Sequence, residues 1–378
     1  MSVKIDKVEV ICLQDPAAGH FRFEGSYQNA LVLVHGSNGL VGFGETDSPP
    51  SVVRAIVEMP TYNSLALGLK ELLEGRVIDH PRRLWDEMYQ ATQWIGRHGV
   101  VLHAISALDI AIWDLFAKSE GKAVCDMMGA KRHDRLPAYA SLYPMACTQD
   151  EIKAQVDPLM AQGFRGFKFF VDPWWDDAEL VHDNLRYLRK LVGPNRTLMC
   201  DVAQEFLNLD QLEPFINLLE EIGVAWIEAP FPIDNLADHI ALKQRTSLPL
   251  TIGDLGFTTC KEFLPFIQAQ CIDIAQPDLT MFGGLSEALK LAEQLKGTHL
   301  GIVPHAYNTD IAIATNLHFA ATLDKPTWIE YSTSPARLRR ELCAGLPAVD
   351  ADGMIAVPKG PGLGLTLNSD LIDEMTIA

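Results

Sequence analysis

Eight short apolar segments recur along the chain after Arg135, and this repetition limits the possible folds more than any other feature. They are LPAYASL, FRGFKFF, TLMCDV, AWIEAP, LTIGD, IDIAQPD, LGIVPHA and TWIEYS. Most are followed by a segment with the periodicity of an amphipathic helix. Eight such units in roughly 200–250 residues predict a TIM-type barrel, without a last helix because irregular sequence follows TWIEYS. An open doubly wound sheet is the alternative, but no GxGxxG motif opens an early helix.

The sequence before these repeats predicts a domain of another kind. VKIDKVEVICLQ predicts a strand, and NALVLVHGSNGLVGFGETD predicts a hairpin that turns at glycine. Helices are predicted over residues 50–75 and 81–118, the second followed by the usual glycine stop signal. We therefore expect an α+β domain over residues 1–130, a barrel over residues 131–345, and a C-terminal segment over residues 346–378 that returns to the first domain.

Charge and cysteine content narrow the classes of function. The formal net charge of −18 repels nucleic acid and anionic membranes. The seven cysteines are scattered without a CxxC pair, which is typical of a reduced, cytoplasmic chain. The N-terminus predicts a strand rather than a signal peptide, and we expect no apolar run of transmembrane length. The composition thus predicts a cytoplasmic globular enzyme that binds neither nucleic acid nor membranes.

Carboxylates end three successive apolar segments. Asp201, Glu228 and Asp254 end the third, fourth and fifth segments, about one β/α unit apart. Because the carboxyl ends of barrel strands share one mouth, these charges would repel one another unless a cation lay between them. Oxygen ligands favour a hard cation such as Mg²⁺. One such acid could equally be a helix N-cap or a surface residue, but three at matching positions predict a metal site.

The following segments predict a general base. Asp278 ends the sixth segment and His305 the seventh, so the carboxylate can fix the tautomer of the imidazole and raise its basicity. Glu330 ends the eighth segment, where it either donates a hydrogen bond to an enolate as a protonated acid or only caps the barrel. Lys168 lies inside the second apolar run, which favours an inward position, where it would hold a substrate carboxylate, over a surface position.

Taken together, the sequence resembles the mandelate racemase group of the enolase superfamily over nearly its whole length. The resemblance is carried by AISALDIAIWDLFAKSEGKAV, GFRGFKFF, LMCDV, WIEAPF, IGD, DIAQPDLTMFGGL, VPHAYN and GPGLGL. It implies an N-terminal α+β capping domain on a (β/α)7β barrel, and Mg²⁺-assisted formation of an enediolate. It also implies that Asp201, Glu228 and Asp254 are the Mg²⁺ ligands and that His305 with Asp278 is the base pair. Glu330 would be the donor on the enolate side, and Lys168 matches the first lysine of a KxK motif.

Three positions depart from the family pattern. Ala203 stands where Asn is frequent, and Asp254 is shorter than the usual Glu. Phe170 occupies the second lysine of KxK, the usual base on the opposite face of the enediolate. With His305 as the one remaining base, the resemblance favours dehydration of a sugar acid to a 2-keto-3-deoxy acid, as in members similar to rhamnonate dehydratase. Asp278 differs from the lysine of muconate-lactonising and dipeptide-epimerase relatives.

Two other functions stay open at this point. A racemase or epimerase would need a second base, for which His20 is the candidate, and a binding protein would keep the barrel without catalysis. We expect substrate selection from the capping loop between residues 14 and 28, through His20 and Arg22, and from Tyr143 and Trp174 at the mouth. For Trp174 and the tryptophan after it, packing between loop and barrel is an equal alternative. A homo-oligomer is also expected, since proteins of this fold commonly form one.

Overall fold

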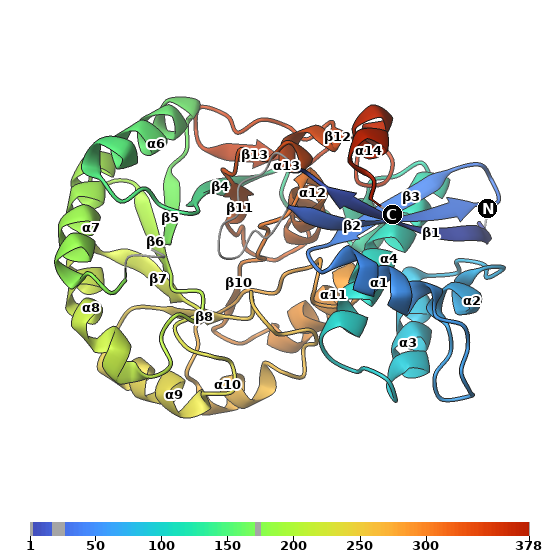
Figure 1. The fold of residues 1–378 in the computed structure, drawn as a ribbon, viewed down its shortest axis with the longest axis horizontal. Coiled ribbons are helices and arrows are strands. Elements are labelled where there is room, and N and C mark those ends of the chain that lie inside the picture. The colour runs from blue at the N-terminus through green and yellow to red at the C-terminus, as the bar shows by residue number, and fades with distance from the viewer. Residues whose placement is uncertain (1–2, 17–26, 171–174, 378) are drawn as a thin grey trace.

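Two sheets of different kinds organise the chain, which a computed structural model describes over residues 3–16, 27–170 and 175–377. The first is an antiparallel sheet of β1 (Ile5–Gln14), β2 (Gln28–Gly36) and β3 (Val41–Thr46). The second is a curled parallel sheet in the order β10-β9-β8-β7-β6-β5-β4-β11. Figure 1 shows the first sheet in blue at the right and the second, running from green to red, at the left.

The strands of the second sheet coincide with the eight apolar segments of the sequence. They are β4 (Arg135–Leu142), β5 (Gly166–Phe170), β6 (Thr197–Asp201), β7 (Val224–Glu228), β8 (Leu250–Ile252), β9 (Ile274–Ala275), β10 (Gly301–Ile302) and β11 (Ile329–Ser332). The pairing of β11 with β4 curls the sheet into a barrel. Near the seam between β10 and β11, Thr327 Oγ1 donates to the Ile302 carbonyl (2.6 Å).

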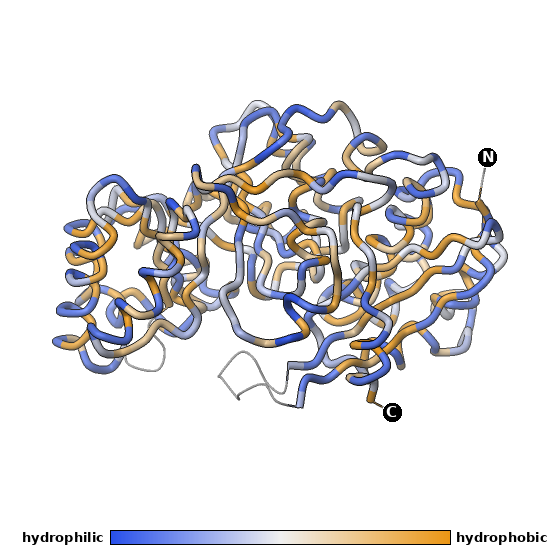
Figure 2. The backbone as a smooth tube through the Cα atoms, turned by 90° about the horizontal axis from the view of Figure 1, so that it is seen from above, coloured by the Kyte–Doolittle hydropathy of each residue, from blue (hydrophilic) through white to orange (hydrophobic). Residues whose placement is uncertain are grey.

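Helices alternate with these strands and cover the outside of the barrel (Figure 1). They are α6 (Gln149–Gln162), α7 (Ala178–Val192), α8 (Leu209–Ile222), α9 (Leu236–Arg245), α10 (Leu264–Ala269), α11 (Gly284–Leu295) and α12 (Asp310–Ala320). Helix α7 buries Val181, Leu185, Leu188 and Val192, a spacing that places them on one face. Figure 2 shows this alternation of hydrophobic and hydrophilic residues along the outer helices. After β11 comes α13 (Arg337–Glu341), of five residues, so the predicted (β/α)7β barrel is confirmed.

The helices of the first domain are shorter than predicted. Residues 50–75 contain α1 (Pro50–Glu58) and α2 (Leu69–Leu73), and residues 81–118 contain α3 (Pro81–Thr92) and most of α4 (Val100–Ser119). Pro60 disfavours helical backbone at the preceding residue, which ends α1. Gly99, with a φ of 67°, separates α3 from α4. The prediction of two long helices was therefore wrong at both breaks.

Helix α4 is the centre of the first domain. It packs so closely on β3 that a Cβ added at Gly42 would lie 2.1 Å from the Ala111 carbonyl oxygen. Within the described residues, α4 is also the one helix long and apolar enough to cross a membrane, so the expectation that no run reaches that length was wrong. Because 83% of its apolar window is buried inside the fold, α4 has the character of a core helix.

The chain beyond α13 contacts both sheets. Its elements are β12 (Cys343–Ala344), β13 (Met354–Ala356), β14 (Thr366–Leu367) and α14 (Ser369–Met375). Strand β13 pairs with β4, and β12 pairs with β14. At β1, Thr376 forms a bridge with Leu13, and the Ile377 amide donates to the Cys12 carbonyl (2.8 Å). Gly362 forms a bridge with Ala123, just before α5 (Val124–Met128). Figure 1 shows both ends of the chain on the side of the antiparallel sheet.

Candidate active site

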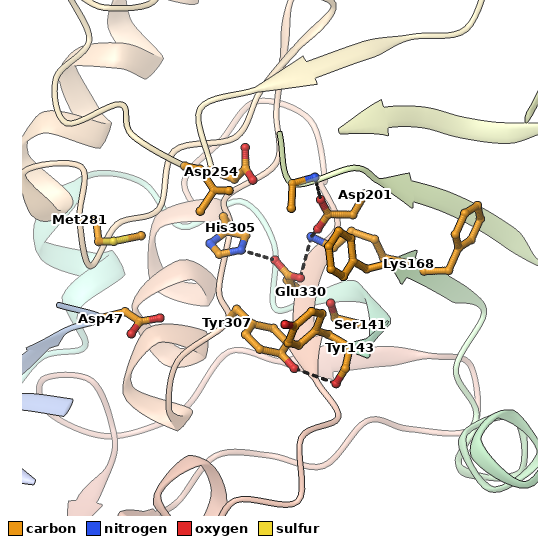
Figure 3. Close-up of a pocket in the computed structure, with 14 residues that line it drawn as sticks. Asp47, Ser141, Tyr143, Lys168, Asp201, Asp254, Met281, His305, Tyr307 and Glu330 are labelled. Carbon is orange, nitrogen blue, oxygen red and sulfur yellow. Dashed lines mark hydrogen bonds and ion pairs between the residues drawn. The ribbon is translucent and has the colours of Figure 1, made fainter. Parts of the chain in front are cut away.

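The carboxyl ends of the barrel strands surround a cavity of about 230 Å³. Figure 3 shows side chains from several strand ends pointing toward one another there, together with Asp47, which follows β3 in the first domain. Of the residues with a role predicted from the sequence, six line this cavity: Tyr143, Lys168, Asp201, Asp254, His305 and Glu330. Glu228 and Asp278 are buried beside it, 0% and 2% exposed, and reach the cavity through their bonds to Lys168 and His305.

Asp201, Glu228 and Asp254, here called the acidic triad, lie together as the sequence predicts. One oxygen of each lies within 4.8 Å of the others. The pKa of Glu228 is raised to about 8 and that of Asp254 to about 6. Burial is the main cause of both shifts, and the neighbouring carboxylates act in the same direction. The buried Asp254 Oδ1 has no hydrogen-bond partner among the described residues. An unpartnered oxygen among three crowded acids fits a hard divalent cation, which would stabilise the charged form of each.

Glu228 is held from both sides. Its Oε2 accepts hydrogen bonds from Trp226 Nε1 (2.9 Å) and Gln276 Nε2 (2.8 Å), while Lys168 donates to its Oε1 (2.5 Å). Thr251 in turn binds the amide oxygen of Gln276. All these partners belong to barrel strands or the turns that follow them, so the barrel itself fixes the position of this carboxylate.

Lys168 supplies positive charge to the site. Its Nζ lies 3.0 Å from Asp201 Oδ2 and 2.9 Å from Glu330 Oε1, in addition to its bond to Glu228. Burial disfavours the charged amine, but the three carboxylates outweigh burial and hold the pKa of Lys168 well above its ordinary value. The side chain is 2% exposed, so it points inward, as its place within an apolar run predicts.

His305 and Asp278 form a hydrogen-bonded pair, with 2.7 Å between His305 Nδ1 and Asp278 Oδ2. The other oxygen of Asp278 accepts bonds from the Thr280 amide and hydroxyl, both 2.7 Å. Burial alone would lower the pKa of His305, but the carboxylates of Glu330 and Asp278 outweigh it and raise the pKa to about 10. A cation at the acidic triad would oppose this negative field and move the pKa of His305 back toward the range of a general base.

Glu330 lies between Lys168 and His305, as Figure 3 shows. Its Oε2 accepts a bond from the Ala306 amide (3.1 Å) and lies 3.7 Å from His305 Nε2. Burial favours the neutral acid, but the charges of Lys168 and His305 outweigh burial and lower the pKa of Glu330 to about 2. Because the Lys168 ammonium lies against Glu330, its surroundings favour the carboxylate, which does not favour the protonated donor among the two alternatives given for Glu330.

Phe170, Tyr143 and Tyr307 form an aromatic wall of the cavity. The ring centroids of Tyr143 and Phe170 lie 5.1 Å apart and those of Tyr143 and Tyr307 5.5 Å apart. The Tyr307 hydroxyl donates to the Tyr143 carbonyl (3.2 Å). Sequence reasoning missed Tyr307, although it lies two residues after His305, and it missed Met281 and Asp47, which also line the cavity.

Three residues predicted to select the substrate, His20, Arg22 and Trp174, lie outside the described residues. Trp175 is 4% exposed, and its ring packs against those of Phe206 and Phe215 at centroid distances of 5.2 and 5.1 Å. For this tryptophan, the alternative of packing between loop and barrel is confirmed.

Comparisons with known proteins agree with this geometry. Residues 7–129 match the mandelate racemase / muconate lactonizing enzyme N-terminal domain, and residues 151–371 match the enolase C-terminal domain-like family. An arabinonate dehydratase of Saccharolobus solfataricus is 27% identical over 341 residues, which are 89% of this chain and 88% of the relative. A D-galactarolactone cycloisomerase of Agrobacterium fabrum is 26% identical over 363 residues, 92% and 90% of the two chains. The crystal structure of the 3,6-anhydro-D-galactonate cycloisomerase from Zobellia galactanivorans has a TM-score of 0.88 at 25% identity and covers 99% of this chain and 100% of its own.

Proposed function

This chain belongs to the mandelate racemase / muconate lactonizing enzyme family of the enolase superfamily, and we propose that it is an acid-sugar dehydratase. The substrate would be a small carboxylate with hydroxyls at C2 and C3, and the products would be a 2-keto-3-deoxy acid and water. Relatives named as a sugar-acid dehydratase and a sugar-lactone cycloisomerase support an enzyme of acid-sugar chemistry. A homo-oligomeric state and a cytoplasmic location stay predictions from the sequence.

The acidic triad would hold a Mg²⁺ ion, since its crowded oxygens, with Glu228 and Asp254 buried and Asp254 Oδ1 without a hydrogen-bond partner among the described residues, fit a hard cation. When bound, the ion supplies positive charge beside the substrate carboxylate, where negative charge grows as the α-proton leaves. Lys168, already in contact with Asp201 and Glu228, adds a second positive charge at the same end of the cavity.

His305 is proposed as the general base. Asp278 holds its Nδ1, which leaves Nε2 to take the proton from C2 of the substrate. The electron pair of the C2–H bond then forms an enediolate, whose charge Lys168 helps to stabilise. The protonated imidazole returns its proton to the C3 hydroxyl as the C3–O bond breaks, so that water leaves, and the resulting enol tautomerises to the 2-keto acid.

The aromatic wall is the observation that carries dehydration over racemisation. A racemase needs a base on each face of the enediolate, whereas a dehydratase that returns the proton to the leaving hydroxyl needs one. At the family position of the second base stands Phe170, which is 3% exposed and packed on Tyr143. A phenyl ring accepts no proton. Racemisation stays the alternative through His20, which lies outside the described residues.

A screen of sugar acids with the purified protein and Mg²⁺ tests this proposal, with semicarbazide to detect the keto acid. The His305→Asn variant serves as the control and should lose at least about 10³-fold of the turnover rate, within the usual range for a general base. Mass spectrometry separates the outcomes, because dehydration removes one water and ring opening of a lactone or ether removes none. Inversion at C2 in D₂O without keto acid would identify a racemase and overturn the proposal.

A further inference from the structure

The turns that carry His305 and Asp278 are each bound by a buried carboxylate of the capping domain. Asp109 on α4 binds the first turn of α11, which follows Asp278, and Glu45 at the end of β3 binds the start of α12, which follows His305. Both carboxylates are 0% exposed. Neither lines the cavity, so their role has to be understood through the segments they hold.

Asp109 holds the first turn of α11. Its Oδ2 accepts a bond from the Ser286 amide (2.9 Å) and its Oδ1 one from the Ser286 hydroxyl (2.6 Å). Two tryptophans of the capping domain add to this contact, because Trp113 Nε1 donates to Ser286 Oγ (2.9 Å) and Trp85 Nε1 to the Gly283 carbonyl (2.6 Å). Gly284 lies so close that a Cβ there would stand 2.5 Å from Asp109 Oδ2.

This contact is mechanically close to the base pair. The Asp278 carbonyl accepts bonds from the amides of Met281 (2.9 Å) and Phe282 (2.6 Å), which form a tight turn directly before Gly283. The backbone from Asp278 to the start of α11 is therefore one hydrogen-bonded unit. A shift at Ser286 would move Asp278, whose other contacts are with His305 and Thr280.

Glu45 holds the first turn of α12 in the same way. Its Oε1 accepts bonds from the amides of Thr309 (3.2 Å) and Ala312 (3.0 Å), and its Oε2 from the Thr309 hydroxyl (2.8 Å). Asn29 on β2 donates both to Glu45 (2.7 Å) and to Asn308 Oδ1 (3.1 Å). Thr309 follows His305 by four residues, so this turn carries the base on the neighbouring strand end.

Burying Asp109 and Glu45 contributes little to the stability of the fold. Burial raises the pKa of Asp109 and of Glu45 to about 7, against the hydrogen bonds from Ser286 and Thr309 that favour the charged forms. Buried ionisable groups are weak contributors to stability and are often replaceable by well-packed apolar residues. What these two carboxylates do provide is orientation, because a carboxylate at a helix N-terminus fixes the positions of the backbone amides that point at it.

We propose that Asp109 and Glu45 are positioning residues through which the capping domain holds Asp278 and His305 in register for proton transfer. The inference rests on the proposed function, in that His305 is taken as the general base. The barrel brings the two partners together through the bridge between Asp278 and His305, and the docked capping domain refines their geometry, because one carboxylate binds the helix start that follows each partner.

The test compares Asp109→Asn and Glu45→Gln with Asp114→Asn in the Mg²⁺-loaded protein. Asp114 is a matched control on the same helix: it is also 0% exposed and accepts bonds from the amides of Phe43 (3.0 Å) and Leu363 (2.8 Å). It therefore ties the C-terminal segment to α4 and β3, pairs with Lys118 (2.6 Å), and bonds neither of the two helix starts that follow Asp278 and His305. All three variants lose a buried carboxylate, so a purely structural role would affect them alike.

The first readout is the pKa of His305 by NMR of ¹⁵N-histidine-labelled protein, assigned with His305→Asn, which needs no substrate. We expect Asp109→Asn and Glu45→Gln to lower this pKa by about one unit, because the bond to Asp278 loosens, and Asp114→Asn to leave it unchanged. On any sugar acid that the wild type converts, the first two should also lose roughly 10- to 100-fold in kcat with KM and Mg²⁺ affinity preserved. Equal shifts in all three variants, or none in the first two, would overturn the inference.

The same readouts separate this inference from the proposed function. If the wild type dehydrates no sugar acid, the dehydratase proposal fails, while the NMR comparison still decides whether the two carboxylates position the base pair. If Asp109→Asn does not fold, Ser286→Ala removes the hydroxyl bond to Asp109 Oδ1 while the amide bond to Oδ2 stays, and it should lower the pKa of His305 in the same direction by a smaller amount. An unchanged pKa in a folded Ser286→Ala protein would count against the role of Asp109.

Discussion

The barrel mouth has two halves that are supported in different ways: the metal side, which carries the acidic triad, and the proton-transfer side, which carries Asp278 and His305. On the metal side, the hydrogen bonds that hold Glu228 come from barrel residues, and the first capping contact in the turn after Asp254 is Gly99 to Thr258 Oγ1 (3.3 Å). On the proton-transfer side, buried capping residues bind the turns that carry Asp278 and His305. The proposed cation site is therefore held by barrel residues. The proposed base pair is also held by the barrel, through the bridge between Asp278 and His305 and the bond from Asn316 to the His305 carbonyl (2.7 Å), and the capping domain adds contacts to both segments.

The backbone after the strand ends differs in the same sense. On the metal side, non-glycine residues adopt left-handed backbone one residue after Glu228 and two residues after Asp201, with φ of 43° at Ala229 and 46° at Ala203. Next to Asp254, the residues with positive φ are Gly253 (112°) and Gly256 (91°). On the proton-transfer side, after Asp278, they are Gly283 (69°) and Gly284 (79°). Strain of this kind persists where the surrounding structure enforces it. On the metal side, the surrounding structure thus holds strained backbone at Ala203 and Ala229. On the proton-transfer side, glycines adopt the left-handed backbone without that strain, and the capping domain binds the segments.

The largest expected effect separates the two halves directly. Glu228→Gln should abolish the stabilisation by Mg²⁺, about 2.7 kcal/mol at a concentration 100 times the dissociation constant, and with it turnover by at least about 10³-fold. Asp278→Asn should lose about 10²- to 10⁴-fold in kcat yet keep the full stabilisation by Mg²⁺. Thermal unfolding with and without Mg²⁺ measures both variants. Loss of the Mg²⁺ effect in Asp278→Asn would show that the two halves are not independent.

The pH dependence of Mg²⁺ binding addresses the metal side alone. Because burial raises the pKa of Asp254 to about 6 and of Glu228 to about 8, protons compete with the cation, and affinity should rise up to about tenfold per pH unit for each proton released. In EDTA, without the cation, the free energy of unfolding should instead fall as pH rises from about 6 to about 8, because carboxyls whose pKa is raised in the folded state lose their protons there. Calorimetry and denaturant unfolding from about pH 5.5 to about 8.5 check both slopes; a flat affinity would place the cation elsewhere.

Gly284→Ala should disturb the proton-transfer side. The residue has a φ of 79°, and the added Cβ would stand 2.5 Å from Asp109 Oδ2, so we expect a loss of about 1–3 kcal/mol in the free energy of unfolding and a lower kcat. Binding of Mg²⁺ should be unchanged. Urea unfolding and calorimetry measure the two effects, and Gly297→Ala, whose Cβ would meet nothing within 4 Å at a similar φ of 82°, separates the clash from backbone strain.

The smallest expected effect is a gain on the metal side. Ala203 adopts left-handed backbone, which Asn tolerates better than Ala, and its amide donates to Asp201 Oδ1 (2.9 Å). Ala203→Asn should therefore raise the free energy of unfolding by up to roughly 1 kcal/mol in denaturant titrations. A destabilised Ala203→Asn protein with an intact cavity would mean that this backbone is not strained.

What could be predicted from the sequence depends on whether a residue is placed by its own strand or by the docking of the two domains. Asp201, Glu228 and His305 were recognisable because they follow apolar strands, and strand ends in a barrel converge whatever the loops do. Asp47 and Glu45 could not be assigned a place, because their neighbours are set by how one domain docks on another, far apart in sequence. The break at Gly99 was visible as a glycine, but the apolar periodicity on both sides of it favoured one long helix.

The return of the chain to β1 has a consequence for its synthesis. The outer edge of β1 is covered where Thr376 and Ile377, which are synthesised near the end of the chain and long after β1, bind Leu13 and Cys12. Until then this edge offers free backbone groups to any neighbouring nascent chain. Chains that end shortly before Thr376 would contain every barrel strand but leave this edge of β1 uncovered, so we expect such truncated proteins to aggregate.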